Sequence, residues 1–190
     1  MNRTPLYLLI TLAAISCGHS DRHDIAVPRP VAYHRITIPD PVYRIAKAGP
    51  VSIQLNSSVT DTIVTAGNSW VTAHYPGLDA SIYITVTEIS PGTADESIDN
   101  RIERMSLNTG GHPTEVISFT TPAGLDARMT VTRAGSPTPV QFMATDHREI
   151  LVSGAGTAGL SVTAPADSLS PITGMLERDI THLLKTLTPQ

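Results

Sequence analysis

Apolar and polar residues alternate along several short segments of the chain, and this pattern predicts β-strands. In the longest run, 80–89, apolar residues occupy every second position from Ala80 to Val86, and Ser81, Tyr83 and Thr85 lie between them. We predict strands over residues 31–38, 51–55, 69–75, 80–89, 115–121, 125–133, 140–146 and 149–156. Short turns separate the last four, which indicates an antiparallel meander.

Residues 93–108 change from this period to that of an amphipathic helix. Ile98, Ile102 and Met105 recur at helical spacing, so they share one face. Thr93 and Glu96 precede them with the spacing of a capping box, in which each side chain bonds the backbone N–H of the other residue. The segment therefore predicts a surface helix that begins at Thr93.

The C-terminal segment carries a longer apolar stripe. Ser170 and Pro171 fit the N-cap and the first helical position. The stripe that follows consists of Ile172, Leu176, Ile180, Leu183, Leu184 and Leu187. Together, the strands and two helices predict an α+β fold, an antiparallel β-sheet with two amphipathic helices packed on it. The order of elements is similar to that of the PsbP/Mog1 sandwich.

The N-terminus reads as a bacterial lipoprotein signal. Arg3 precedes an apolar run over residues 5–15, far shorter than the roughly 20 residues that cross a bilayer. Ala14, Ser16 and Cys17 then resemble a lipobox, in which the cysteine thiol receives a diacylglycerol. We predict a signal peptide over 1–16, a lipid-anchored tether over 17–30 and a single α+β domain over 31–190. The alternative is an ordinary secretion signal with Cys17, the sole cysteine, as an incidental thiol.

Composition narrows the classes of partner. The chain has 13 basic and 17 acidic side chains, and no segment concentrates the basic ones, so we expect no nucleic-acid partner. Its aromatic residues are one Trp, five Tyr and two Phe, too few for a platform that stacks bases. Trp70 and Tyr75 are either packed in the sheet or exposed as anchors for a protein partner.

The sequence offers weak candidates for chemistry. The glycines of 154–159 match the dinucleotide-binding pattern G-x-G-x-x-G, but extended chain rather than a helix follows them. His19 and His23 have a spacing that binds zinc on a helix, yet they lie in the predicted tether. Asp146 and His147 are adjacent in a turn, where their side chains diverge. We therefore expect no catalytic residues, no metal and no cofactor, with an unrecognised hydrolase as a minor alternative.

Several blocks of the sequence together resemble a known lipoprotein family. They are the start around Tyr33, Arg35 and Pro39, the Trp70 to Tyr75-Pro76 and Ala80-Ser-Ile-Tyr83 blocks, Gln141-Phe142 with Thr145-Asp146, and Asp179-Ile-Thr-His182-Leu. Their order is similar to that of the gliding motility lipoprotein GldD family of Bacteroidota. Many members carry cysteines near positions 49 and 69, where this chain has Gly49 and Ser69.

The resemblance implies a non-enzymatic lipoprotein of the cell envelope, an accessory or assembly component of gliding motility and type IX secretion. Its partners would be the membrane, through lipid on Cys17, and envelope proteins of that machinery. Tyr33, Arg35, Trp70 and Tyr75 are the expected partner contacts. We expect the outer membrane rather than the inner one, with the side left open. The alternative function is a periplasmic carrier of a small ligand or hydrophobic cargo.

Overall fold

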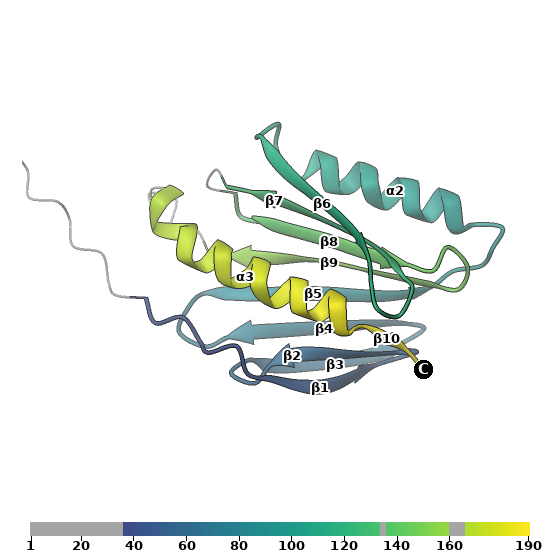
Figure 1. Cartoon of the computed structure of the whole chain (residues 1–190), viewed down its shortest axis with the longest axis horizontal. Helices are drawn as coiled ribbons and strands as arrows, with labels where there is room; N and C mark the ends of the chain where they lie inside the picture. Colours follow the sequence, from purple (N-terminus) through teal and green to yellow (C-terminus); the bar gives the residue numbers. More distant parts are fainter. Residues whose placement is uncertain (1–35, 134–135, 160–165) are drawn as a thin grey trace, which may run out of the picture. The chain divides into compact units, whose positions relative to one another are not determined.

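Most of the alternating segments form a seven-stranded antiparallel sheet in the computed structural model, which describes residues 36–133, 136–159 and 166–190. The strand order is β3-β4-β5-β9-β8-β7-β6, so β3 and β6 are the edges (Figure 1). The strands are β3 (Thr60–Ala66), β4 (Asn68–Tyr75), β5 (Ala80–Glu88), β6 (Thr114–Thr120), β7 (Asp126–Thr132), β8 (Val140–Thr145) and β9 (Ile150–Ala158). The predicted meander is confirmed as β6 to β9.

Three further strands of the described residues form a second sheet, which is not joined to the first by strand pairing. It contains β1 (Tyr43–Ala48), β2 (Val51–Asn56) and the short β10 (Thr188–Pro189), in the order β1-β2-β10. The strand predicted over 51–55 is confirmed as β2. All the described residues belong to one compact unit, His34–Gln190. None of the helices in the described residues is both long and apolar enough to cross a membrane.

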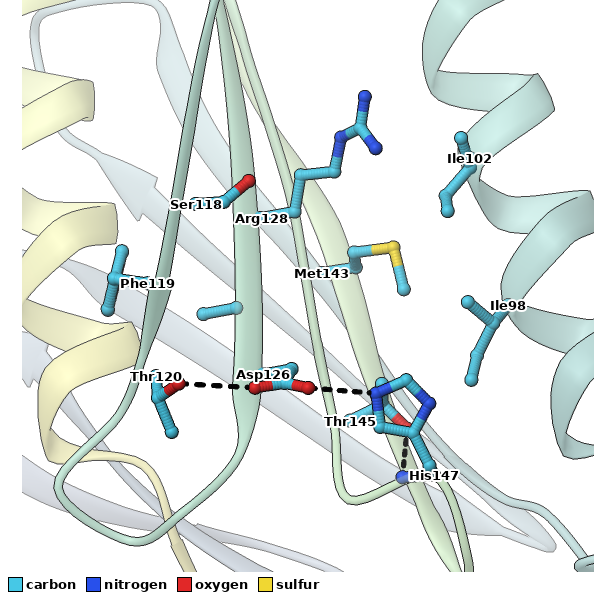
Figure 2. A pocket seen from close by; sticks show the side chains of 11 residues that line it. Ile98, Ile102, Ser118, Phe119, Thr120, Asp126, Arg128, Met143, Thr145 and His147 are labelled. Carbon is cyan, nitrogen blue, oxygen red and sulfur yellow. Dashed lines mark hydrogen bonds and ion pairs between the residues drawn. The ribbon is translucent and has the colours of Figure 1, made fainter.

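The two helices, α2 (Ala94–Leu107) and α3 (Ala166–Thr186), pack on opposite faces of the large sheet. Neighbouring residues of β8 show this, because adjacent side chains of a strand point to opposite faces. Phe142 belongs to the cluster that contains the α3 stripe, whereas Met143 packs with Ile98 and Met105 of α2. Figure 2 shows the strands between α3 on the left and α2 on the right. The predicted α+β fold is confirmed, and the PsbP/Mog1 likeness stays a prediction.

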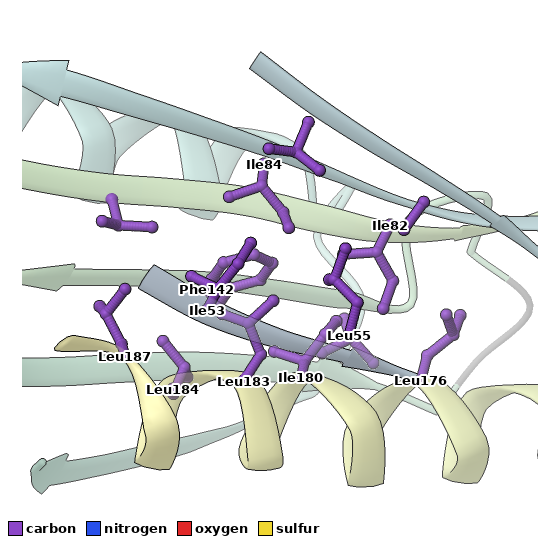
Figure 3. Packing of buried hydrophobic residues seen from close by; sticks show 14 of the residues in the cluster. Ile53, Leu55, Ile82, Ile84, Phe142, Leu176, Ile180, Leu183, Leu184 and Leu187 are labelled. Carbon is purple, nitrogen blue, oxygen red and sulfur yellow. The ribbon is translucent and has the colours of Figure 1, made fainter. Parts of the chain in front are cut away.

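The main core lies between the large sheet, β2 and α3. Side chains of the α3 stripe point at Ile53 and Leu55 of β2 and at the inner face of β5 and β8 (Figure 3). Gly156 of β9 permits this close approach. A Cβ there would lie 3.0 Å from Ile180 Cδ1 and 3.3 Å from Leu176 Cβ, so a side chain would push the helix outward.

Three local predictions need correction. The segment 36–38 forms no strand, and 31–35 lie outside the described residues. The Thr93 side chain makes no cap to α2, because its hydroxyl instead bonds Ser90 O at 3.3 Å in the preceding turn. Helix α3 begins at Ala166, so Pro171 lies inside the helix rather than at its first position.

Candidate functional site

Trp70 lies on the face of the large sheet opposite the main core. In β4, Val71, Ala73 and Tyr75 are buried, so Trp70 points the other way. Helix α2 packs on that side against Met143 of β8 and Leu151 of β9, whereas Trp70 lies on β4, two strands along the sheet from β9. As a result, 44% of Trp70 is exposed to solvent.

Two further side chains extend this surface. Val64 of β3 pairs directly with Trp70, and Tyr83 of β5 pairs with Thr72, two residues along β4. Paired residues of antiparallel strands share a face, so the three side chains point the same way. Val64 is 50% exposed and Tyr83 is 49% exposed. We call Val64, Trp70 and Tyr83 the open sheet face.

The open sheet face has the composition of a protein contact. Trp and Tyr are enriched among the residues that dominate binding energy, and charged residues are depleted at the centres of interfaces. Threonines surround the cluster at positions 62, 72 and 85. The surface can therefore bury aromatic and aliphatic area against a partner without leaving a charge unpaired.

Tyr75, expected as a partner contact, is instead a core residue. It is 1% exposed, because the alternation of β4 turns it toward α3. Its hydroxyl donates to Asp179 Oδ2 at 2.7 Å. A side chain in this position contacts no partner of the folded protein, so the expectation for Tyr75 is wrong.

Asp179 of α3 is the centre of a polar network within the core. The carboxylate is 3% exposed and accepts hydrogen bonds from four side chains. The donors are Tyr43 Oη at 2.8 Å, Tyr75 Oη at 2.7 Å, Asn56 Nδ2 at 3.2 Å and Arg178 Nε at 2.7 Å. A buried carboxylate is tolerated only with such partners, because its charge is otherwise costly to remove from water.

The tyrosines of this network are held in their neutral form. Burial, reinforced by the Asp179 carboxylate, raises the pKa of Tyr43 to about 12. Burial and Asp179 raise the pKa of Tyr75 further. Burial lowers the pKa of His182, which stacks on Tyr43 with ring centroids 3.6 Å apart. At neutral pH both phenols carry their proton and donate it in a hydrogen bond to Asp179.

The same network fastens the segment that precedes β1. Arg178 donates to the carbonyl of Pro39 at 3.1 Å, and Asn56 donates to the carbonyl of Asp40 at 3.0 Å. Both donors also bind Asp179, so the carboxylate orients them. The network thus fixes the point at which the chain enters the two-sheet core, and we assign it a structural role.

A groove of about 410 Å³ lies between α2 and the strands β6, β7 and β8. Ile98 and Ile102 form its helical wall, and Met143 lies on the sheet side (Figure 2). At one end, His147 Nε2 lies 3.1 Å from Asp126 Oδ2. The Thr120 hydroxyl donates to Asp126 rather than to the imidazole, so the contacts lack the nucleophile–base–acid order of a catalytic triad.

The remaining chemical candidates have structural explanations. Gly154 and Gly156 lie in the middle of β9, within a paired strand rather than in a turn at the N-terminus of a helix, where dinucleotide binding requires them. Asp146 accepts hydrogen bonds from the backbone N–H groups of Arg148, Glu149 and Ile150, each at 2.9 Å. Burial opposes ionisation of Asp146, but these donors prevail and lower its pKa. Asp146 therefore shapes a turn.

Several predicted sites lie outside the described residues. They are Cys17, His19, His23, Tyr33 and Arg35. Within 36–133, 136–159 and 166–190, no cluster of His, Cys, Asp and Glu could hold a metal ion.

Positions 49 and 69 lie side by side. A Cβ built on Gly49 would lie 3.3 Å from Ser69 Cβ, close to the separation found in disulfides. The two positions at which the resemblance implies cysteines in many family members are thus neighbours in space. In this chain the two positions are Gly49, which has a φ of 58°, and Ser69, so they form no disulfide.

Comparison with known proteins gives one family. The family model of the gliding motility lipoprotein GldD matches residues 23–188, which include nearly all of the described chain. No curated protein matches the chain. A match of this extent covers both sheets, the open sheet face and the Asp179 network, and it shows that the chain belongs to the GldD family of gliding motility lipoproteins.

Proposed function

We propose that this chain is a non-enzymatic accessory component of gliding motility and type IX secretion that binds an envelope protein through the open sheet face. The observation that carries the proposal is the exposure of Trp70, Val64 and Tyr83 on one uncharged patch. Family membership supports the motility context. The Thr120–Asp126–His147 contacts lack the order of a catalytic triad, which supports binding rather than catalysis.

In this proposal, lipid on Cys17 holds the domain at a membrane, the outer membrane in our interpretation. Residues 17–30 then act as the tether, at up to roughly 3.5 Å per residue when extended. Anchoring raises the concentration of the domain near partners in the same membrane, which strengthens a moderate contact without new interactions. The Asp179 network supports this arrangement, because it fastens the chain at Pro39 and Asp40, just beyond the tether.

The anchor is tested by Cys17→Ser. We expect the variant to incorporate no labelled fatty acid and to leave the membrane fraction, because the lipid bond requires the thiol. Metabolic labelling and fractionation measure both. A folded but released variant should restore secretion poorly in a deletion strain. If the native chain takes up no label, the lipoprotein interpretation is wrong.

The contact surface is tested by Trp70→Ala. We expect the melting temperature to stay close to that of the native chain, since the side chain is half exposed. Partner binding should weaken by about 2 kcal/mol, the loss typical of an aromatic hot spot. Secretion of proteins that bear type IX C-terminal signals should fall toward the level of the deletion strain.

Leu107→Ala is the matched control for this test, because Leu107 is an exposed apolar residue of α2 away from the open sheet face. We expect it to secrete normally. Normal secretion and normal co-purification of envelope proteins by the Trp70 variant would contradict the proposed contact surface.

A carrier of a small apolar ligand is the second candidate, and the groove beside α2 favours it. Carriers bury most of their ligand's surface. The groove is partly rimmed by exposed Thr120, Asp126 and His147, so it would leave a ligand accessible to water. Native mass spectrometry of the chain extracted from envelopes distinguishes the two, because a stoichiometric bound small molecule would favour the carrier.

A further inference from the structure

Strand β6 has a free backbone edge. It pairs with β7 on one side and ends the seven-stranded sheet on the other. Thr121 N donates to Leu125 O at 2.8 Å next to the β6–β7 turn, which marks a hydrogen-bonded pair. Such pairs alternate along an antiparallel ladder, so the N–H and C=O groups of Val116 and Ser118 point outward. Within the described residues, no hydrogen bond reaches these outward groups.

Cavities lie beside β6 on both faces of the sheet. On the α3 face, Ile117 and Phe119 line a cavity of about 500 Å³ together with Thr181. On the α2 face, Val116 lines a smaller cavity of about 220 Å³, and Ser118 lines the groove of about 410 Å³. In Figure 2, Phe119 points toward α3 and Ser118 toward α2. A strand added beside β6 would direct alternate side chains toward the cavity on the α3 face and toward the cavities on the α2 face.

A basic side chain lies on each face of the sheet beside β6. Arg128 lines the groove on the α2 face and Lys185 lines the cavity on the α3 face. Neither forms an ion pair with another described residue. Of the acidic groups beside the edge, Glu115 pairs with Arg133, and Asp126 lines the same groove as Arg128 and lies 3.1 Å from His147 Nε2. The edge therefore presents, on each face, one basic side chain that forms no ion pair with a described residue.

We propose that β6 binds an extended segment of a partner protein as an additional antiparallel strand, and that this segment carries apolar residues between acidic ones. Val116 and Ser118 form backbone hydrogen bonds with the added strand, and the cavities on both faces determine which side chains of that strand fit. Carboxylates of the segment neutralise Arg128 and Lys185. A second copy of the chain is a poorer occupant, because two-fold pairing of β6 would double both positive charges instead of neutralising them.

The test uses the full chain, purified in detergent, and a synthetic peptide, acetyl-Glu-Val-Thr-Val-Thr-Val-Thr-Glu-amide. Because its length is even, its two glutamates lie on opposite faces of the strand. Hydrogen exchange reports the amides of Val116 and Ser118, and calorimetry reports affinity. We expect saturable binding that protects both amides. The measurement depends neither on the open sheet face nor on a role in motility, so its failure leaves the proposed function intact.

Three comparisons locate the interaction. Ser118→Pro removes an outward N–H and leaves the β7 ladder in place, so it should weaken binding by about tenfold without lowering the melting temperature. Ser118→Ala is its control and should bind normally. Arg128→Gln with Lys185→Gln should abolish the preference for this peptide over one with lysines in place of the glutamates. The peptide methylated at alternate backbone nitrogens should not bind.

Four outcomes would overturn the proposal. They are no binding, equal binding by native chain and Ser118→Pro, equal binding of the methylated peptide, and Val116 and Ser118 amides that are already protected without peptide. The last result would mean that another part of the chain covers the edge. A dimer that Ser118→Pro dissociates would replace the partner segment by a second copy.

Discussion

Leu183→Asp is expected to abolish the folded state. Leu183 is 1% exposed and lies midway along the α3 stripe, packed between β2 and the large sheet (Figure 3). Removing a buried leucine side chain costs about 2–5 kcal/mol, and a buried carboxylate without a partner adds several more. Natural domains have about 5–15 kcal/mol of stability in total, so little would remain. Circular dichroism and a protease-resistance assay measure the loss.

The control is Leu107→Asp on α2. Leu107 is 70% exposed, so the same chemical change there should lower stability by only about 1 kcal/mol, from a carboxylate and a poorer helix former at the end of α2. If Leu183→Asp and Leu107→Asp melt at the same temperature, α3 does not seal the core as the structure shows.

In the correctly predicted strands β2, β4 and β5, apolar and buried positions largely coincide. In β5, Ile82, Ile84 and Val86 face the core and Tyr83 faces solvent, so the period of two is visible in the sequence. The meander was predictable for a second reason. Its strands are joined by short turns that favour pairing of neighbours, so no information about distant segments was needed.

Strands β1 and β3 are not predicted from the sequence, because their apolar positions do not match their buried positions. In β1, the buried residues are the small Ala46 and Ala48, whereas Ile45 is 68% exposed. The apolar pattern therefore points away from the buried face. In β3, Ile63 and Val64 are adjacent, so they lie on opposite faces of an edge strand and produce no alternation. Both strands are set by pairing with a partner strand, β2 or β4, rather than by their own period.

The candidate site was only partly predictable for a related reason. Trp70 was singled out by residue type, and the structure shows it exposed beside Val64 and Tyr83, a grouping that depends on strand register. The Asp179 network joins β1, β2, β4 and α3, which are far apart in the sequence. Its one sequence signal is a charged residue beside the apolar stripe, at the start of the block Asp179-Ile-Thr-His182-Leu.

Asp179→Ala is expected to destabilise the domain by about 3–5 kcal/mol. The change leaves the buried Tyr75 hydroxyl without its acceptor and deprives Tyr43 and Arg178 of a charged one. Hydrogen bonds to charged groups contribute about 1.5–3 kcal/mol each, and an unsatisfied buried donor adds a penalty. Chemical denaturation of the variant and the native chain measures the difference. Glu177→Ala is the control, because it removes a partly buried carboxylate of α3 whose partner is the exposed Arg133.

The change in stability at alkaline pH distinguishes the contribution of the Asp179 network from that of apolar packing. Tyr43 has its pKa raised from 10.0 to about 12 in the folded chain, so its neutral form contributes stability below pH 10 that is lost as the pH rises toward 12. Burial is the largest cause and Asp179 adds to it, so Asp179→Ala should lower this pKa only in part. Ultraviolet titration of the phenols should therefore show earlier ionisation in the variant. Unchanged titration together with unchanged stability would mean that Asp179 does not hold the two tyrosines.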